Sequence, residues 1–201
     1  MKLYQHPLST FARRVRMQLI EKSVTLEEQI VDMENGEHRS EAYRRLNPYG
    51  RVPTLTDGDF VLYESSAIMD YVERLHPTPP LLPSDSQARA RVAMHVKLCD
   101  LQVGVYTPTL FFPRRFFPRE RWNLAAQDQA RDAISLHLDI VSQQLGNRPY
   151  LVGDTFTLAD LAYCILTPFL DLFELRPQEN VLAWMERIES RPSARQTRPS
   201  R

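Results

Sequence analysis

The sequence has little of what marks secreted, zinc-binding or membrane-spanning chains. Its 201 residues include only two cysteines, Cys99 and Cys164, and no CxxC or Cys/His spacing, so neither a disulfide framework nor a metal site is predicted. The N-terminus lacks the apolar core of a signal peptide, and no uninterrupted apolar run approaches the ~18 residues that span a bilayer. These absences lead us to expect a cytoplasmic protein without a membrane partner.

The chain also lacks an excess of charge of either sign. Lys and Arg number 25, as do Asp and Glu, so no global field favours binding to nucleic acid. Arginines are interleaved with phenylalanines between Arg114 and Arg121, a pattern that could stack bases and contact phosphates. On a neutral chain this short patch favours a solvated rim instead, and no nucleic-acid partner is predicted.

What is present in the first eighty residues is an alternation of strand and helix signals. Strand-like runs around Leu3 and over 26–31 flank a helical pattern over 11–22, and a short polar helix is expected over 36–46. Two further strands bracket the hairpin turn signal at 57–59, and a helix follows over 65–75. This order predicts a small mixed sheet with helices on its faces, in an α/β domain over 1–76.

A proline-rich segment over 77–84 follows, and beyond it the strand signals nearly stop. Helical periodicity runs over 85–112, 123–145, 158–173 and 181–190, so residues 85–201 are predicted to form an all-helical domain. The polar, basic residues 191–201 are expected to fray. One helix start is well specified: Thr157 and Asp160 have the spacing of a capping box, with Phe156 and Leu161 at the positions of a hydrophobic staple.

Four motifs, in this order and spacing, carry a resemblance that runs nearly end to end. They are His6–Ser9 before Arg13–Val15, Asn47–Leu55, Tyr63–Ile68 and Gly153–Asp160. Together they resemble the cytosolic glutathione transferases, and the first motif is most similar to the serine-type, phi-like and related bacterial members. The resemblance implies a thioredoxin-like domain that binds glutathione, followed by a helical-bundle domain that forms the electrophile pocket.

The resemblance also implies roles for individual residues. Ser9 would activate the glutathione thiol, and Glu64 would pair with the γ-glutamyl ammonium while Ser65, at a helix start, binds its carboxylate. His38 and Arg39 would hold the glycyl carboxylate. Pro53, in the cis form, would turn Val52 so that its backbone pairs with the cysteinyl unit like an added strand. Arg51 stands where the family often has glutamine.

Each of these residues also has a purely structural interpretation. Ser9 could cap the helix that begins near Thr10, and Thr10 is itself the rival thiol donor. Glu64 and Ser65 could be a helix start with Ser65 as its N-cap, His38 and Arg39 a solvated face, and Pro53 a strand-edge proline. Capping and ligand binding by a serine are compatible, so both interpretations stay open here.

The second-substrate pocket is expected from aromatic residues late in the 85–112 helix and its exit. Its predicted lining is Thr10, Phe11, Tyr106, Leu110, Phe111 and Phe117. An apolar lining would select hydrophobic electrophiles, whereas ordinary interhelical core is the alternative interpretation of the cluster. The family is usually dimeric, and Tyr49 is a candidate anchor of a homodimer.

Three functions compete. The leading hypothesis is a detoxifying glutathione transferase with glutathione as co-substrate, and glutathione peroxidase activity as a further possibility. The second is a non-catalytic transferase-fold protein that binds RNA polymerase, similar to stringent starvation protein A. The third is a glutathione-dependent isomerase or dehalogenase that shares the same site.

Overall fold

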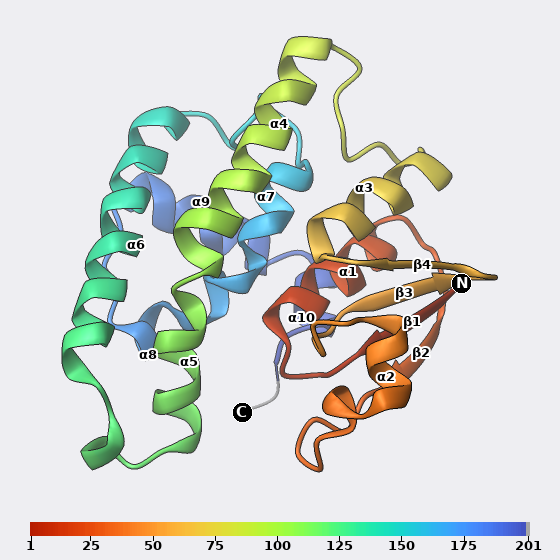
Figure 1. Ribbon diagram of the computed structural model, residues 1–201. Helices are drawn as coiled ribbons and strands as arrows, with labels where there is room; N and C mark the ends of the chain where they lie inside the picture. The colour runs from red at the N-terminus through yellow and green to blue at the C-terminus, as the bar shows by residue number, and fades with distance from the viewer. Residues whose placement is uncertain (200–201) are drawn as a thin grey trace. The chain divides into compact units, whose positions relative to one another are not determined.

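The computed structural model describes residues 1–199, and the chain divides into two compact units (Figure 1). The first comprises Met1–Leu81 together with the residues from Pro192 onward, and the second comprises Leu82–Arg191. The first unit mixes strands and helices, and the second is built of helices and turns. The expected class, a thioredoxin-like α/β unit plus an all-helical unit, is confirmed.

The sheet of the first unit has four short strands in the order β2-β1-β3-β4. They are β1 (Lys2–Gln5), β2 (Glu27–Ile30), β3 (Thr54–Asp57) and β4 (Phe60–Tyr63). β1 pairs with β2 in parallel, whereas β1–β3 and β3–β4 are antiparallel. Gly58 has a φ of +57° in the hairpin between β3 and β4, which confirms the turn signal at 57–59.

Helices cover both faces of this sheet, as the alternation of side chains along β1 requires. Leu3 is fully buried on one face, and there α1 (Thr10–Glu21) and α3 (Ser65–Leu75) bury their apolar sides. Tyr4 points to the other face and contacts Tyr43 of α2 (Glu41–Leu46), which a 3₁₀ turn over Glu37–Arg39 precedes. Figure 1 shows α2 on the opposite side of the sheet from α1 and α3.

The start of the proline-rich segment is fixed to the first unit by a buried ion pair. Lys22 Nζ lies 2.7 Å from a Glu73 carboxylate oxygen and donates to the carbonyl of Pro79, also at 2.7 Å. The same carboxylate accepts from the Leu81 amide at 3.0 Å. Because the ammonium and the carboxylate are both satisfied by backbone groups of this segment, the chain up to Leu81 belongs with the sheet.

The helical unit contains α4 (Ser86–Cys99), α5 (Thr107–Phe116), α6 (Leu124–Leu145), α7 (Leu158–Ala162), α8 (Leu170–Phe173) and α9 (Glu179–Glu189). The single helix expected over 85–112 is interrupted by a wider π turn over Asp100–Gly104, which ends in a glycine. The helix expected over 158–173 is likewise split by 3₁₀ turns, because Pro168 has no amide hydrogen to donate.

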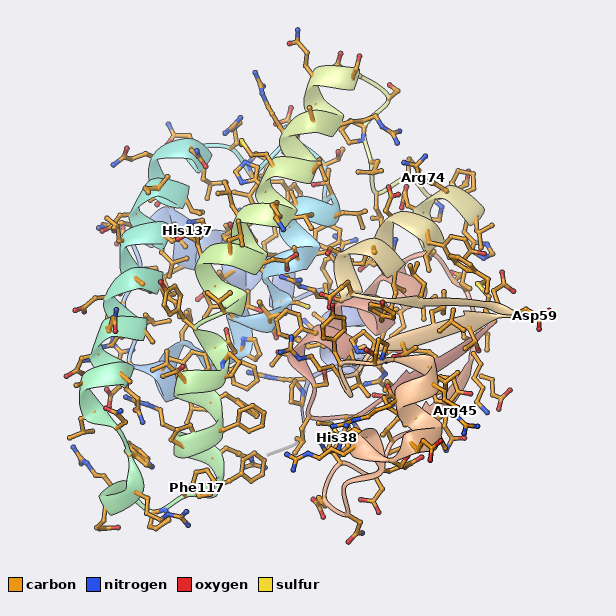
Figure 2. All side chains as sticks on the ribbon, viewed as in Figure 1. His38, Arg45, Asp59, Arg74, Phe117 and His137 are labelled. Atoms are coloured by element: carbon orange, nitrogen blue, oxygen red, sulfur yellow. The ribbon has the colours of Figure 1, made fainter. Side chains whose placement is uncertain are left out.

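The predicted capping box is confirmed and is the centre of a buried network. The Asp160 carboxylate accepts from the Thr157 amide at 2.9 Å, the Leu151 amide at 2.8 Å and Trp184 Nε1 at 2.9 Å. Burial raises the pKa of this carboxyl, and the hydrogen bonds oppose that shift. In the same unit, His137 of α6 (labelled in Figure 2) shares a 2.8 Å hydrogen bond with the Tyr163 hydroxyl. Burial lowers the pKa of the His137 imidazole to about 4.

The expectation that residues 191–201 fray from the helical domain is wrong for residues 192–199. Pro192–Gln196 forms α10, which packs against α1 within the first unit. The Arg13 guanidinium donates to the Ala194 carbonyl at 3.1 Å, and the Ser193 hydroxyl donates to the Glu21 carboxylate. Polar side chains of α1 thus provide partners that the segment's polar composition did not suggest. Ser200 and Arg201 lie outside the described residues.

None of the helices formed by residues 1–199 combines the length and the apolar character that a membrane crossing requires.

Candidate active site

Ser9 ends the loop between β1 and α1 and caps the helix. Its hydroxyl oxygen accepts from the Ala12 amide at 3.1 Å, so the structural interpretation of this residue is confirmed. The same hydroxyl donates, over 3.5 Å, toward the carbonyl of Val52. Ser9 is half-buried, whereas its neighbour Thr10 is only 7% exposed. The hydroxyl of Ser9 is therefore the more accessible of the two rival donors.

The Val52–Pro53 peptide is cis, as the resemblance implies. Two hydrogen bonds hold the turn in place: the Arg51 carbonyl accepts from the Tyr43 hydroxyl and from Asn47 Nδ2, each at 2.8 Å. The Arg51 side chain itself is exposed. Asn47 belongs to one of the four motifs, but no role was predicted for it. The Asn–Pro pair ahead of the cis turn was the signal that could have indicated its contact with the turn.

Glu64 and Ser65 begin α3 differently from the expected structural interpretation, which made Ser65 the N-cap. Glu64 is the N-cap, with a φ of +71° and no hydrogen bond from its side chain to the helix, and Ser65 is the first helical residue. A left-handed backbone at a residue other than glycine costs about 1–3 kcal/mol and persists only where its surroundings impose it. The Glu64 carboxylate is thereby exposed at the helix start.

Two hydrogen bonds fix the register of α1 against α3. Arg14 donates to the Ser65 hydroxyl at 3.4 Å, and one turn further along both helices Gln18 donates to the Met69 carbonyl at 2.8 Å. The helices are therefore parallel, and their N-termini lie at the same end of the unit. Both positive ends of the helix dipoles are directed to that end.

The hairpin brings the cis turn to the same place. Thr54 of β3 pairs with Tyr63 of β4, so Pro53, just before β3, and Glu64, just after β4, are neighbours at that edge of the sheet. Ser9, Val52, Pro53, Glu64 and Ser65 thus gather at one edge of the first unit. At this edge the Ser9 hydroxyl, the exposed Glu64 carboxylate and the backbone groups of the cis turn lie close together.

His38 and Arg39 lie in the 3₁₀ turn before α2 and contact each other. His38 Nε2 accepts from Arg39 Nε at 3.1 Å, and burial, followed by the charges of Arg39 and Arg44, lowers the pKa of the imidazole. The lowered pKa favours the neutral imidazole of His38, labelled in Figure 2, and the exposed Arg39 guanidinium is the cationic group of the pair. Gly50, shortly before the cis turn, packs closely against His38: a Cβ added at Gly50 would lie 2.7 Å from the His38 carbonyl oxygen.

The residues predicted to line the second-substrate pocket differ in their exposure. In the helical unit Leu110 is fully buried, and Phe111, 6% exposed, packs edge-on against Phe169 at 5.2 Å, so both belong to the interhelical core. Tyr106 is half-buried, and Phe117 (Figure 2) is 43% exposed with Arg121 over its ring. In the first unit Phe11 is half-buried, and the Arg14 guanidinium lies over its ring at 5.1 Å.

No group of three or more His, Cys, Asp or Glu side chains that could hold a metal ion occurs among the described residues.

Comparison with known sequences supports the resemblance over both units. The glutathione S-transferase N-terminal domain family matches residues 3–80, and the C-terminal domain family matches residues 109–192. Glutathione S-transferase F6 of Arabidopsis thaliana is 33% identical, over 96% of each chain. A stringent starvation protein A homolog of Coxiella burnetii is 34% identical, over 85% of this chain and 74% of its own length.

Solved structures give the same result. Glutathione transferase F2 of Populus trichocarpa superposes with a TM-score of 0.87 at 32% identity, over 98% of this chain and 96% of its own. A maleyl pyruvate isomerase, described as a bacterial glutathione S-transferase of the zeta class, superposes with a TM-score of 0.85 at 28% identity, over 99% and 97%. The chain belongs to the glutathione S-transferase family.

Proposed function

We propose that this protein binds glutathione at the edge formed by Ser9, the cis turn and the start of α3, and activates its thiol for attack on hydrophobic electrophiles. The observation that carries the proposal is the position of the Ser9 hydroxyl, 3.5 Å from the carbonyl of Val52. A thiol whose peptide pairs with Val52 would therefore come within reach of that hydroxyl.

In the proposed complex the cysteinyl backbone adds to the turn like a short strand. The Val52 carbonyl accepts the cysteinyl N–H of glutathione in place of the Ser9 hydroxyl. The proton of Ser9 is then free to donate to the sulfur, while its oxygen continues to accept from Ala12. Capping the helix and holding the thiolate thus use different parts of one hydroxyl group.

The two ends of the tripeptide are bound by opposite charges. The exposed Glu64 carboxylate pairs with the γ-glutamyl ammonium, and Ser65 and the amide groups of the first turn of α3 bind the γ-glutamyl carboxylate. Arg39 supplies the charge for the glycyl carboxylate, and neutral His38 orients it through their shared hydrogen bond. The exposed Arg51 side chain contributes a second cation near the peptide.

The magnitude of thiol activation is sufficient for chemistry at neutral pH. A hydrogen bond to a charged group is worth ~1.5–3 kcal/mol, and the α1 dipole adds ~0.3–2 kcal/mol. Together these lower the thiol pKa from ~8.5 by about 1.3–3.7 units at ~1.36 kcal/mol per unit. The pKa of the bound thiol then lies at about 4.8–7.2, so thiolate makes up at least about 40% of bound glutathione at pH 7.

The thiolate sulfur forms a bond to an electrophilic carbon, whose leaving group departs with the electron pair while the thiol proton goes to solvent. The exposed Phe117 and half-buried Tyr106 are the residues of the helical unit that we propose contact an apolar electrophile. Reduction of a hydroperoxide to an alcohol and water, in which a second glutathione completes the disulfide, is the second reaction to assay.

The deciding experiment replaces Ser9 and its rival separately. Ser9→Ala should retain glutathione binding, lower kcat by ~10–100-fold, equivalent to ~1.4–2.7 kcal/mol, and raise the pKa in the pH–rate profile. Thr10→Ala is the matched control, because its buried hydroxyl should not reach the thiol. If Thr10→Ala abolishes activation while Ser9→Ala leaves the rate and the thiol pKa intact, Thr10 is the donor. If neither change has an effect, the serine-type mechanism is wrong.

Two other functions remain as alternatives, because a stringent starvation protein A homolog and a maleyl pyruvate isomerase match the chain. A non-catalytic protein like stringent starvation protein A need not bind glutathione, so calorimetry with the wild-type protein separates it from an enzyme. An isomerase would bind glutathione and regenerate it during turnover, whereas a reductive dehalogenase would oxidise two glutathione molecules to the disulfide as the halide leaves. Product analysis distinguishes both from conjugation. We also propose a homodimer with Tyr49, 66% exposed, as an anchor.

A further inference from the structure

The buried polar contact between α1 and α3 has no role in the proposed chemistry so far. Arg14 is fully buried, Ser65 is only 5% exposed, and the guanidinium donates to the Ser65 hydroxyl at 3.4 Å. Arginine is rarely buried without a partner, because removing a guanidinium from water is costly. Here it stands directly behind the first residue of α3.

We infer that Arg14 is a positioning residue for the γ-glutamyl carboxylate of glutathione and acts through Ser65. The inference rests on the proposed glutathione site. A fully buried guanidinium cannot contact the ligand itself, so its effect must pass through the groups in front of it. Ser65, at the start of α3, is the first of these.

The direction of the hydrogen bond explains the effect. The guanidinium has only donors, so the Ser65 oxygen must accept from it. A hydroxyl whose oxygen is engaged in this way keeps its proton for another acceptor, and a carboxylate is such an acceptor. The Arg14 contact therefore orients the Ser65 O–H outward from the two helices, toward the helix start where the γ-glutamyl carboxylate would bind.

Charge adds to orientation. Arg14 places a full positive charge behind the α3 N-terminus, where the dipole already favours an anion. An anion at this position is favoured by the dipole, by the Ser65 proton and by Arg14 together.

Gln18 provides the internal comparison. It lies one turn after Arg14 on the same face of α1, is equally buried, and also donates to α3, but to the Met69 carbonyl within the helix. Gln18 therefore contributes to helix packing and register without acting on any group at the helix start. If burial and register were all that mattered, the two residues would behave alike.

The test measures recognition of one carboxylate by isothermal calorimetry. The ligands are glutathione and 4-aminobutanoyl-cysteinylglycine, which lacks only the γ-glutamyl carboxylate. The proteins are wild type, Arg14→Gln and Gln18→Leu, each first shown to be folded by thermal melting. If Arg14→Gln does not fold, Arg14→Lys, which keeps a cation without the planar donor fork, takes its place.

We expect wild type to prefer glutathione over the analogue, and Arg14→Gln to reduce that preference about tenfold by weakening glutathione binding alone. Gln18→Leu should lower the melting temperature and keep the preference. In a Ser65→Ala background, Arg14→Gln should have a smaller effect than in wild type, because the group it acts through is gone.

Four outcomes overturn the inference. Equal weakening of both ligands by Arg14→Gln, or the same loss in the Ser65→Ala background, would mean a purely structural role. If wild type binds no glutathione, the proposed function fails and this inference with it. If wild type binds and turns over glutathione but Arg14→Gln keeps the full preference, only the role of Arg14 fails.

Discussion

Replacing Gly50 with alanine tests whether the cis-turn segment holds the His38–Arg39 pair in place. Gly50 has a φ of +59°, and an added Cβ would lie 2.7 Å from the His38 carbonyl oxygen. Ordinary van der Waals contact begins near 3.4 Å, so the turn that carries His38 would have to move by about 0.7 Å. The substitution thus acts on the proposed glycyl end of the site without touching a proposed ligand group.

The chain contains a matched control for the backbone strain. Gly58, in the hairpin, has a φ of +57°, and an added Cβ would meet no atom within 4 Å. Gly58→Ala should therefore cost only the ~1–2 kcal/mol of an alanine in the left-handed region. Gly50→Ala should cost the same plus ~1–3 kcal/mol for the overpacked contact. The difference isolates the contact with His38.

Thermal melting and glutathione titration together measure the result. At about 2–4 °C per kcal/mol for a chain of this size, Gly50→Ala should melt roughly 2–12 °C below Gly58→Ala. It should also weaken glutathione binding, because displaced His38 no longer orients Arg39, while Gly58→Ala keeps wild-type affinity. Equal melting temperatures and equal affinities in the two variants would refute the proposed role of this contact.

Three further predictions follow from individual side chains. Glu64→Ala should weaken glutathione binding by ~2–5 kcal/mol in calorimetry, because the ligand ammonium loses a carboxylate that is exposed in the free protein and would be desolvated with it in the complex, and an unchanged Kd removes Glu64 from the site. Phe111→Ala should cost ~3–5 kcal/mol of stability as a core cavity, whereas the exposed Phe117→Ala should keep the melting temperature and change the preference among electrophiles; the reverse pattern would exchange their roles. In the folded protein the pKa of His137 is lowered to about 4. Between pH 6.5 and 4 the His137 imidazole is therefore protonated in the unfolded chain but not in the folded one. The free energy of unfolding falls as pH falls through that window, by at most ~1.4 kcal/mol per pH unit. Urea melts at pH 7 and 5 should show a smaller decrease for His137→Gln than for wild type, and an equal decrease would assign it to other groups.

Local signals in the sequence were sufficient for most elements of the fold. The hairpin at 57–59 and the capping box at Thr157 and Asp160 depend on residues within a few positions of one another, and both were predicted correctly. The break at Asp100–Gly104 was missed because apolar residues keep a helical period across it. A π turn changes the hydrogen bonding without interrupting that pattern.

Non-local contacts explain the larger errors. Residues 192–199 are polar and basic, which suggested a frayed end, but their partners Arg13 and Glu21 lie more than 170 residues earlier. The composition of a segment cannot show that one of its backbone carbonyls accepts a hydrogen bond from a buried guanidinium elsewhere in the chain. The helix expected over 65–75 is found as α3, but the structural interpretation that made Ser65 its N-cap was wrong by one residue for a similar reason. Glu64 has a left-handed backbone, which local preference disfavours and which only tertiary structure can impose.

The candidate site shows why the structural and functional interpretations of a serine could not be separated by sequence. A hydroxyl has acceptor lone pairs and one proton. Ser9 uses its oxygen to cap α1, and Ser65 uses its oxygen to accept from Arg14, so in each case the fold occupies the acceptor. The remaining proton of each serine is the one that the proposed mechanism gives to glutathione, to the sulfur and to the carboxylate. Fixing the oxygen to the fold restricts the directions in which the proton can be donated, which lowers the entropy cost of binding.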